Sequence, residues 1–78
     1  MNIKKLLENE YEIIVSNIDE FANILINSYE AGLEVSNMTY QYYRSGRVKE
    51  LLKDTKIVME LVQDPDSSNF GKVAFNLI

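Results

Sequence analysis

The chain has 78 residues, no cysteine, no histidine and a formal net charge of −4 at pH 7. This length allows one domain, 1–78, and no more. The missing residue types exclude disulfides and thiolate metal sites, and they remove the commonest general base. No apolar run approaches the roughly 18 residues of a membrane span, and the N-terminus lacks the unbroken apolar core of a signal peptide. We therefore expect a cytoplasmic protein with no membrane partner.

The charge is spread unevenly along the chain. Residues 1–38 carry a net charge of −5, residues 39–56 carry +3, and residues 57–78 carry −2. An acidic body with one basic segment is the main electrostatic feature of this sequence.

The N-terminal segment is predicted to contain a short helix and a strand. Residues 2–9 have apolar side chains at helical spacing, whereas YEIIV at 11–15 is aromatic and β-branched, which favours a strand. A single helix from Ile3 to Ile14 stays open as the alternative, because its apolar residues would also line one face.

The best-specified element is a helix over residues 16–33. Ser16 is the expected N-cap, and Gly32 is the expected left-handed residue that ends the helix. Advancing by 100° per residue gives an apolar face made of Ile18, Phe21, Ala22, Leu25, Ile26, Tyr29 and Leu33. The opposite, solvated face is made of Asp19, Glu20, Asn23, Asn27, Glu30 and Glu34.

The next segment permits two interpretations. Residues 37–45 alternate as a strand would, yet Ser36 followed by good helix formers suits a helix equally well. Gly46 predicts a break or turn, because glycine costs a helix about 1 kcal/mol relative to alanine. Ser45 would then cap a helix over 48–53.

Residues 56–63 and 70–78 are predicted to form a β-hairpin. Apolar residues alternate in both segments, and QDPDSSN between them is rich in turn formers. A hairpin alone is marginal in water, so we expect it to pack against helix 16–33, with Leu25 at the centre and residues 11–15 joining the sheet. The predicted fold class is α+β, with an amphipathic helix on a small antiparallel sheet.

No catalytic constellation stands out. Glu8, Glu10 and Glu12 are closely spaced carboxylates, but a solvated strand edge explains them better than acid–base chemistry or a divalent cation site. No GxGxxG, Walker A or nucleophile–base pattern occurs in the sequence. We therefore expect neither an enzyme nor a requirement for a metal or cofactor.

Residues 35–47, VSNMTYQYYRSGR, resemble the recognition helix and exit of Cro-type helix-turn-helix repressors. The positions that match are Val35, Ser36, Thr39 and Gly46. The resemblance implies a small DNA-binding transcriptional regulator, whose fold can end in a β-hairpin. Glu30 and Glu34 depart from the family, since they stand where it prefers a small residue and a glycine. Phosphates would also be repelled by the acidic helix, so this is the second of two hypotheses.

The first hypothesis is protein binding. The acidic face of helix 16–33 would complement a basic, nucleic-acid-binding surface, and tyrosine and arginine are residue types that dominate binding hot spots. The candidate protein-binding residues are Asp19, Glu20, Glu30, Glu34, Tyr40, Tyr42, Tyr43, Arg44 and Arg47. In general character the chain is similar to phage-encoded anti-restriction and anti-CRISPR inhibitors, which occupy a host nuclease. A domain this small could also pair with a second copy of itself, so a homodimer stays open as an alternative.

Overall fold

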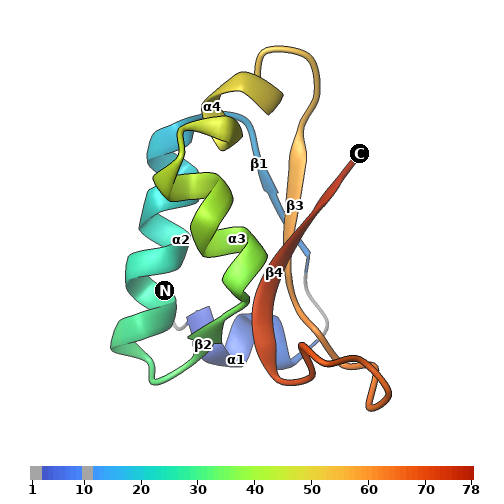
Figure 1. The fold of residues 1–78 in the computed structure, drawn as a ribbon. Coiled ribbons are helices and arrows are strands. Elements are labelled where there is room, and N and C mark those ends of the chain that lie inside the picture. The colour runs from blue at the N-terminus through green and yellow to red at the C-terminus, as the bar shows by residue number, and fades with distance from the viewer. Residues whose placement is uncertain (1–2, 10–11) are drawn as a thin grey trace.

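The computed structural model describes residues 3–9 and 12–78, which form an α+β domain with helices on one side of a sheet (Figure 1). The helices of this part of the chain are α1 (Ile3–Glu8), α2 (Ile18–Glu30), α3 (Asn37–Arg44) and α4 (Arg47–Leu51). The strands are β1 (Ile13–Val15), β2 (Glu34–Val35), β3 (Ile57–Leu61) and β4 (Lys72–Leu77). The predicted fold class is confirmed.

The sheet is mixed rather than antiparallel. Its order is β1-β3-β4-β2, so the hairpin strands are central and the two shorter strands form the edges. β3 runs antiparallel to β1 and β4, whereas β2 runs parallel to β4, with Val35 opposite Val73. The sequence did not indicate β2, because a strand of two residues is too short to show alternation.

The hairpin is confirmed, and a β-bulge closes it. The Val62 N–H donates to the Lys72 carbonyl and the Gly71 N–H donates to the Val62 carbonyl, each over 2.9 Å. Gly71 has φ of +79°. Two residues of one strand therefore face one residue of the other, with the first in the left-handed region, which is the G1 type of bulge.

Helix α2 is confirmed, but Ser16 is not its N-cap. Asn17 is the cap: its Oδ1 accepts a hydrogen bond from the Glu20 N–H over 3.0 Å. The Glu20 carboxylate reaches back and accepts from the Ser16 N–H, also over 3.0 Å. This reciprocal arrangement is a variant of the capping box, and it uses the asparagine that directly precedes the helix.

The other end of α2 closes as predicted at Gly32. This residue has φ of +79°. The N–H groups of Gly32 and Leu33 donate to the carbonyls of Tyr29 and Ser28, over 3.0 and 2.8 Å. These two bonds form a Schellman motif, which satisfies carbonyls that the helix end would leave unpaired.

The buried face of α2 is rotated relative to the prediction. Its buried side chains are Phe21, Ile24, Leu25 and Ser28. Ile26 and Tyr29, which were predicted to be buried, are 53% and 51% exposed. Ser28 tolerates burial because its hydroxyl donates to the Ile24 carbonyl over 2.6 Å, which leaves no unpaired polar group. The predicted apolar face left out both Ile24 and Ser28, so it was placed on the wrong side of the helix.

Aromatic rings join the helices to the sheet. Phe21 is fully buried; its ring centroid lies 6.0 Å from that of Phe75 of β4, edge to face, and 5.9 Å from that of Tyr43 of α3, stacked. Leu25 is 3% exposed, which confirms its predicted central position. The other fully buried apolar residues include Leu7, Val15, Val48, Ile57, Met59 and Val73.

The remaining segments resolve the open alternatives. The short N-terminal helix is confirmed as α1, and the strand interpretation of 11–15 is confirmed for β1; residues 2, 10 and 11 lie outside the described part. Residues 37–44 are helical, and Gly46, with φ of +81°, separates α3 from α4. Ser45 ends α3 and does not cap α4, because Gly46 occupies that position.

Candidate protein-binding surface

The outward side of α2 carries an acidic surface with an apolar centre. Asp19, Asn23, Ile26 and Glu30 are exposed and follow the spacing i, i+4, i+7 and i+11, so they form one line opposite the buried residues. Tyr29, exposed, flanks this line. We call these five residues the acidic α2 surface. Ile26 and Tyr29 were assigned to the core from the sequence; Ile24, an apolar residue that the predicted apolar face left out, is the signal that would have placed them outside.

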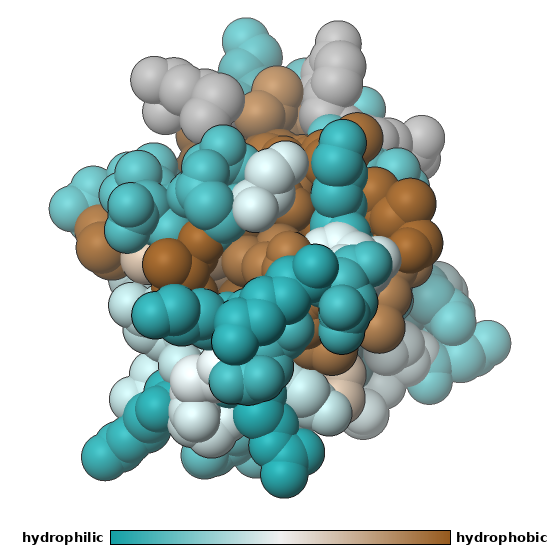
Figure 2. All heavy atoms as spheres, turned by 90° about the horizontal axis from the view of Figure 1, so that it is seen from above, coloured by the Kyte–Doolittle hydropathy of each residue, from teal (hydrophilic) through white to brown (hydrophobic). Residues whose placement is uncertain are grey.

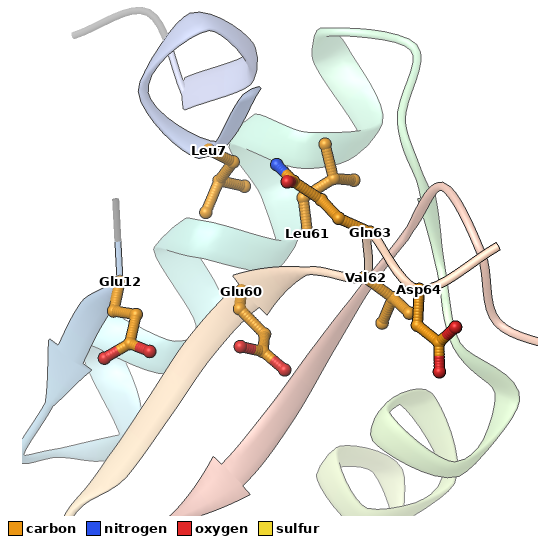
Figure 3. Close-up of a pocket in the computed structure, with 7 residues that line it drawn as sticks. All are labelled: Leu7, Glu12, Glu60, Leu61, Val62, Gln63 and Asp64. Carbon is orange, nitrogen blue, oxygen red and sulfur yellow. The ribbon is translucent and has the colours of Figure 1, made fainter. Parts of the chain in front are cut away.

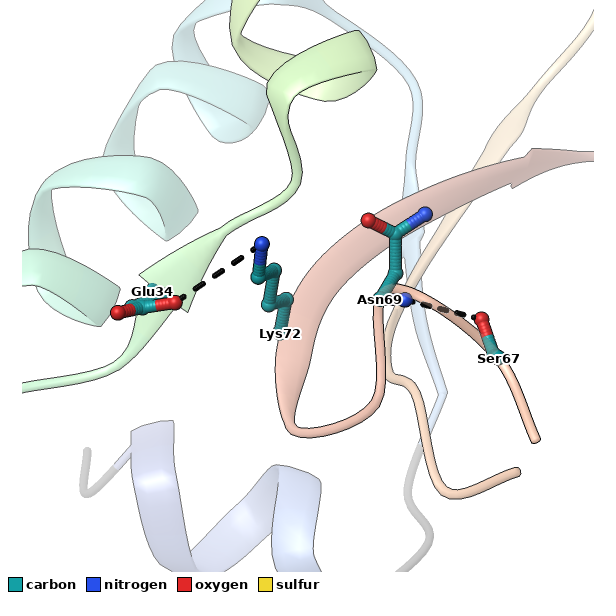
Figure 4. Close-up of polar contacts among 4 residues, drawn as sticks. All are labelled: Glu34, Ser67, Asn69 and Lys72. Atoms are coloured by element: carbon teal, nitrogen blue, oxygen red, sulfur yellow. Dashed lines mark hydrogen bonds and ion pairs between the residues drawn. The ribbon is translucent and has the colours of Figure 1, made fainter. Parts of the chain in front are cut away.

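Two of the predicted carboxylates have other structural roles. Glu20 is exposed but engaged, because its carboxylate accepts from the Ser16 N–H and the Asn17 amide, each over 3.0 Å. Glu34 lies on β2 instead of on the helix, and its carboxylate is 4.0 Å from the Lys72 ammonium (Figure 4). The prediction that Glu34 shares the face of α2 is wrong, because the helix ends before Gly32.

Two of the three predicted tyrosines, Tyr42 and Tyr43, pack against the core while keeping exposed edges. The Tyr42 ring lies edge to face on Phe75, with centroids 5.4 Å apart, and Tyr43 stacks on Phe21. Tyr42 is half-buried, whereas Tyr40 and Tyr43 are each 36% exposed. The Tyr42 and Tyr43 rings form an outer layer of the core, so only part of their area remains for a partner.

The predicted arginines are exposed at the junction of α3 and α4. The Arg47 guanidinium lies 5.6 Å from the centroid of the Tyr42 ring, a cation–π arrangement. Neither Arg44 nor Arg47 forms an ion pair with a carboxylate of residues 3–9 or 12–78. The structure therefore separates the nine predicted residues into an acidic group on α2, a basic aromatic group on α3 and α4, and Glu34 apart from both.

The connection between α2 and α3 differs from a helix-turn-helix. Residues 31–36 join the helices and include β2, which pairs with β4, whereas the motif uses a turn of three to four residues. Ser36 and Thr39, two of the positions that match the Cro-type pattern, are fully buried, with their hydroxyl oxygens 2.7 Å apart. Ser36 also accepts from the Thr39 N–H as the N-cap of α3. Helix capping accounts for these two matches.

A hollow of about 340 Å³ lies beside α1 and the end of β3 (Figure 3). Glu12 and Glu60 line it from neighbouring segments, and Asp64 lines it from the hairpin loop, with its carboxylate lying apart from theirs in Figure 3. Within residues 3–9 and 12–78, no three histidine, cysteine, aspartate or glutamate residues are grouped so as to hold a metal ion. Glu10 of the predicted carboxylate cluster lies outside the described residues.

A smaller hollow of about 240 Å³ lies where α4 meets the start of α2, lined by Asn17, Ile18, Lys49, Leu52 and Lys53. Figure 2 looks down on the molecule from above and shows apolar atoms between hydrophilic side chains.

Among the helices of the described part, none is long and apolar enough to cross a membrane.

Comparison of the chain with protein-family models, with curated proteins and with solved structures found no match. The function is therefore argued from the surface itself.

Proposed function

We propose that the chain is a non-enzymatic protein-binding module that docks the acidic α2 surface on a basic surface of a partner protein. The observation that carries this proposal is the exposure of Ile26 and Tyr29 inside an acidic face. Single exposed apolar residues are ordinary, but two of them at i and i+3 form one apolar patch with a charged rim. This is the composition of a binding surface with a desolvated centre and a polar edge.

The two kinds of residue have different roles in this proposal. Asp19 and Glu30 steer encounter with a basic partner, so they affect the association rate and its dependence on salt. Tyr29 and Ile26 are buried in the complex and supply affinity, so their removal mainly speeds dissociation. In its most specific form, the partner is a host protein whose nucleic-acid-binding surface the chain occupies, as anti-restriction and anti-CRISPR inhibitors do.

Charge-matched variants test this surface. The double variant Asp19→Lys/Glu30→Lys reverses the acidic α2 surface, and Asp54→Lys/Asp66→Lys changes the net charge equally at exposed positions between α4 and β3 and in the hairpin loop. Each tagged variant is used to capture partners from nuclease-treated lysate of the native host, and captured proteins are quantified by mass spectrometry. A basic protein retained by wild type and by the control, but lost with Asp19→Lys/Glu30→Lys and with Tyr29→Ala, supports the proposal.

Two results would refute it. One is a partner that Asp19→Lys/Glu30→Lys and Tyr29→Ala retain as well as wild type does, because the binding surface would then lie elsewhere. The other is a shift of duplex DNA with sequence preference at physiological salt, weakened by Arg44→Ala and Arg47→Ala. That result would replace protein binding with the DNA-binding hypothesis.

A further inference from the structure

The edge of β4 that faces β2 is unpaired over more than half of the strand. β2 covers this edge only at Lys72 and Val73. The chain then turns away into α3 at Ser36, whose N–H donates to the Val73 carbonyl over 2.9 Å. Beyond Val73, no strand of residues 3–9 or 12–78 lies on this edge.

The hydrogen bonds of the hairpin show which backbone groups face the open edge. The Val62 N–H donates to the Lys72 carbonyl, and the Ile78 N–H donates to the Lys56 carbonyl over 3.1 Å. Antiparallel strands alternate residues that bond to the partner with residues that do not, so the even-numbered residues of β4 bond to β3. Phe75 and Leu77 therefore turn their N–H and C=O groups to the open edge, where they can pair with another strand.

An apolar groove runs beside this edge. A hollow of about 260 Å³ is lined by Met38, Tyr42, Leu51, Phe75, Asn76 and Leu77. Its lining residues come from α3, α4 and the part of β4 that leads to the C-terminus, and Figure 1 shows this part of β4 next to α3. Met38 and Leu77 are 53% and 54% exposed, so apolar side chains stand on both walls. A strand placed on the edge would direct alternate side chains toward this groove.

A positive charge lies beside the groove, whose own lining residues are uncharged. The Arg47 guanidinium lies over the ring of Tyr42, which lines the groove, and Arg47 has no ion pair among the described residues. The Glu50 carboxylate of the same helix is 3.9 Å from the Lys53 ammonium. A carboxylate on the occupant would complement Arg47. A second copy that paired its own β4 with this edge would offer no side-chain carboxylate, because residues 72–78 contain no aspartate or glutamate.

We propose that an extended, acidic segment of a partner protein binds here as an additional β-strand. Its backbone pairs with Phe75 and Leu77, its alternate apolar side chains enter the groove, and a carboxylate meets Arg47. Backbone hydrogen bonds supply affinity in this mode of recognition, and the side-chain pockets supply specificity. This site is separate from the acidic α2 surface. It selects an acidic segment, whereas the acidic α2 surface selects a basic partner.

The test uses a display library of random twelve-residue peptides selected on the wild-type protein. Leu77→Pro is the key variant, because it removes an N–H group at the open edge that makes no bond to β3. Urea unfolding checks that this variant folds. We expect the enriched peptides to alternate apolar residues, to contain aspartate or glutamate, and to bind Leu77→Pro and Met38→Asp at least tenfold more weakly. Ile14→Asp is the matched control: Ile14 is also more than half exposed, on β1, and this variant should bind as wild type does.

Amide exchange by NMR gives a second readout that does not depend on the proline variant. The N–H groups of Phe75 and Leu77, which make no bond to β3, should exchange at least tenfold more slowly with a bound peptide than in the free protein. No enrichment on wild type over Leu77→Pro would overturn the proposal, as would peptides that bind both equally. Protection of both amides in the free protein, with a dimer that Leu77→Pro abolishes, would assign the edge to a second copy instead.

Discussion

Leu25 and Ile26 are consecutive apolar residues on α2, and the structure gives them opposite environments. Leu25 is 3% exposed, whereas Ile26 is more than half exposed. Leu25→Ala removes about three carbon atoms, worth about 0.8 kcal/mol each when buried, or roughly 2.4 kcal/mol in total. The cavity left behind brings the expected loss to about 2–5 kcal/mol. A chain of this length is stable by about 4–12 kcal/mol, so the substitution should remove a large share of that free energy.

Ile26→Ala is the matched control for this measurement. It removes the same number of carbon atoms from a side chain that already contacts water, and alanine is the better helix former. The expected loss is therefore below about 1 kcal/mol. Urea unfolding at 25 °C followed by far-UV circular dichroism measures both values, with equal slopes showing that the unfolded states are comparable.

The order of the two losses decides whether α2 is oriented as described. Equal losses, or a larger loss for Ile26→Ala, would mean that the buried face is the one the apolar spacing predicted. The acidic α2 surface would then lose its apolar centre, and the proposed function would lose its main support.

Three further predictions concern local features. Gly32→Ala should cost about 1–2 kcal/mol in urea unfolding, because φ of +79° strains an alanine backbone although its Cβ would meet no atom within 4 Å. Ser36→Ala should cost about 1–2 kcal/mol in the same assay, because it removes the N-cap of α3 and leaves the buried Thr39 hydroxyl without its partner. EDTA should leave the melting temperature unchanged in differential scanning calorimetry, since the described residues hold no metal-binding group.

Elements with strong local signals were predictable from the sequence. The hairpin followed from alternation and a turn-rich loop, and the end of α2 followed from Gly32. β2 was not predictable, because its two residues take part in the sheet only through β4, far along the chain. The rotation of α2 was missed because Ile24 and Ser28 were left out of the predicted apolar face. A serine can bury its hydroxyl against its own helix, so polarity alone does not report exposure.

The candidate site was predictable in composition but not in arrangement. The sequence placed Asp19 and Glu30 on a solvated helix face, and the structure agrees. It placed Glu34 with them, because nothing local shows that the chain has already entered a strand. The open edge of β4 depends on pairing between distant segments, which periodicity within one segment cannot reveal.

The strand order also determines when this protein can fold. Both central strands come last in the sequence, and both edge strands come first. A chain synthesised as far as Lys56 holds every helix of the described part, yet it lacks β3 and β4, with which β1 and β2 pair. Phe21 and Leu25 then have no sheet to cover them. Helices that form as the chain leaves the ribosome are transient, because cooperative folding requires the C-terminal hairpin. A chain that terminates before the hairpin therefore stays unfolded, with its apolar residues exposed.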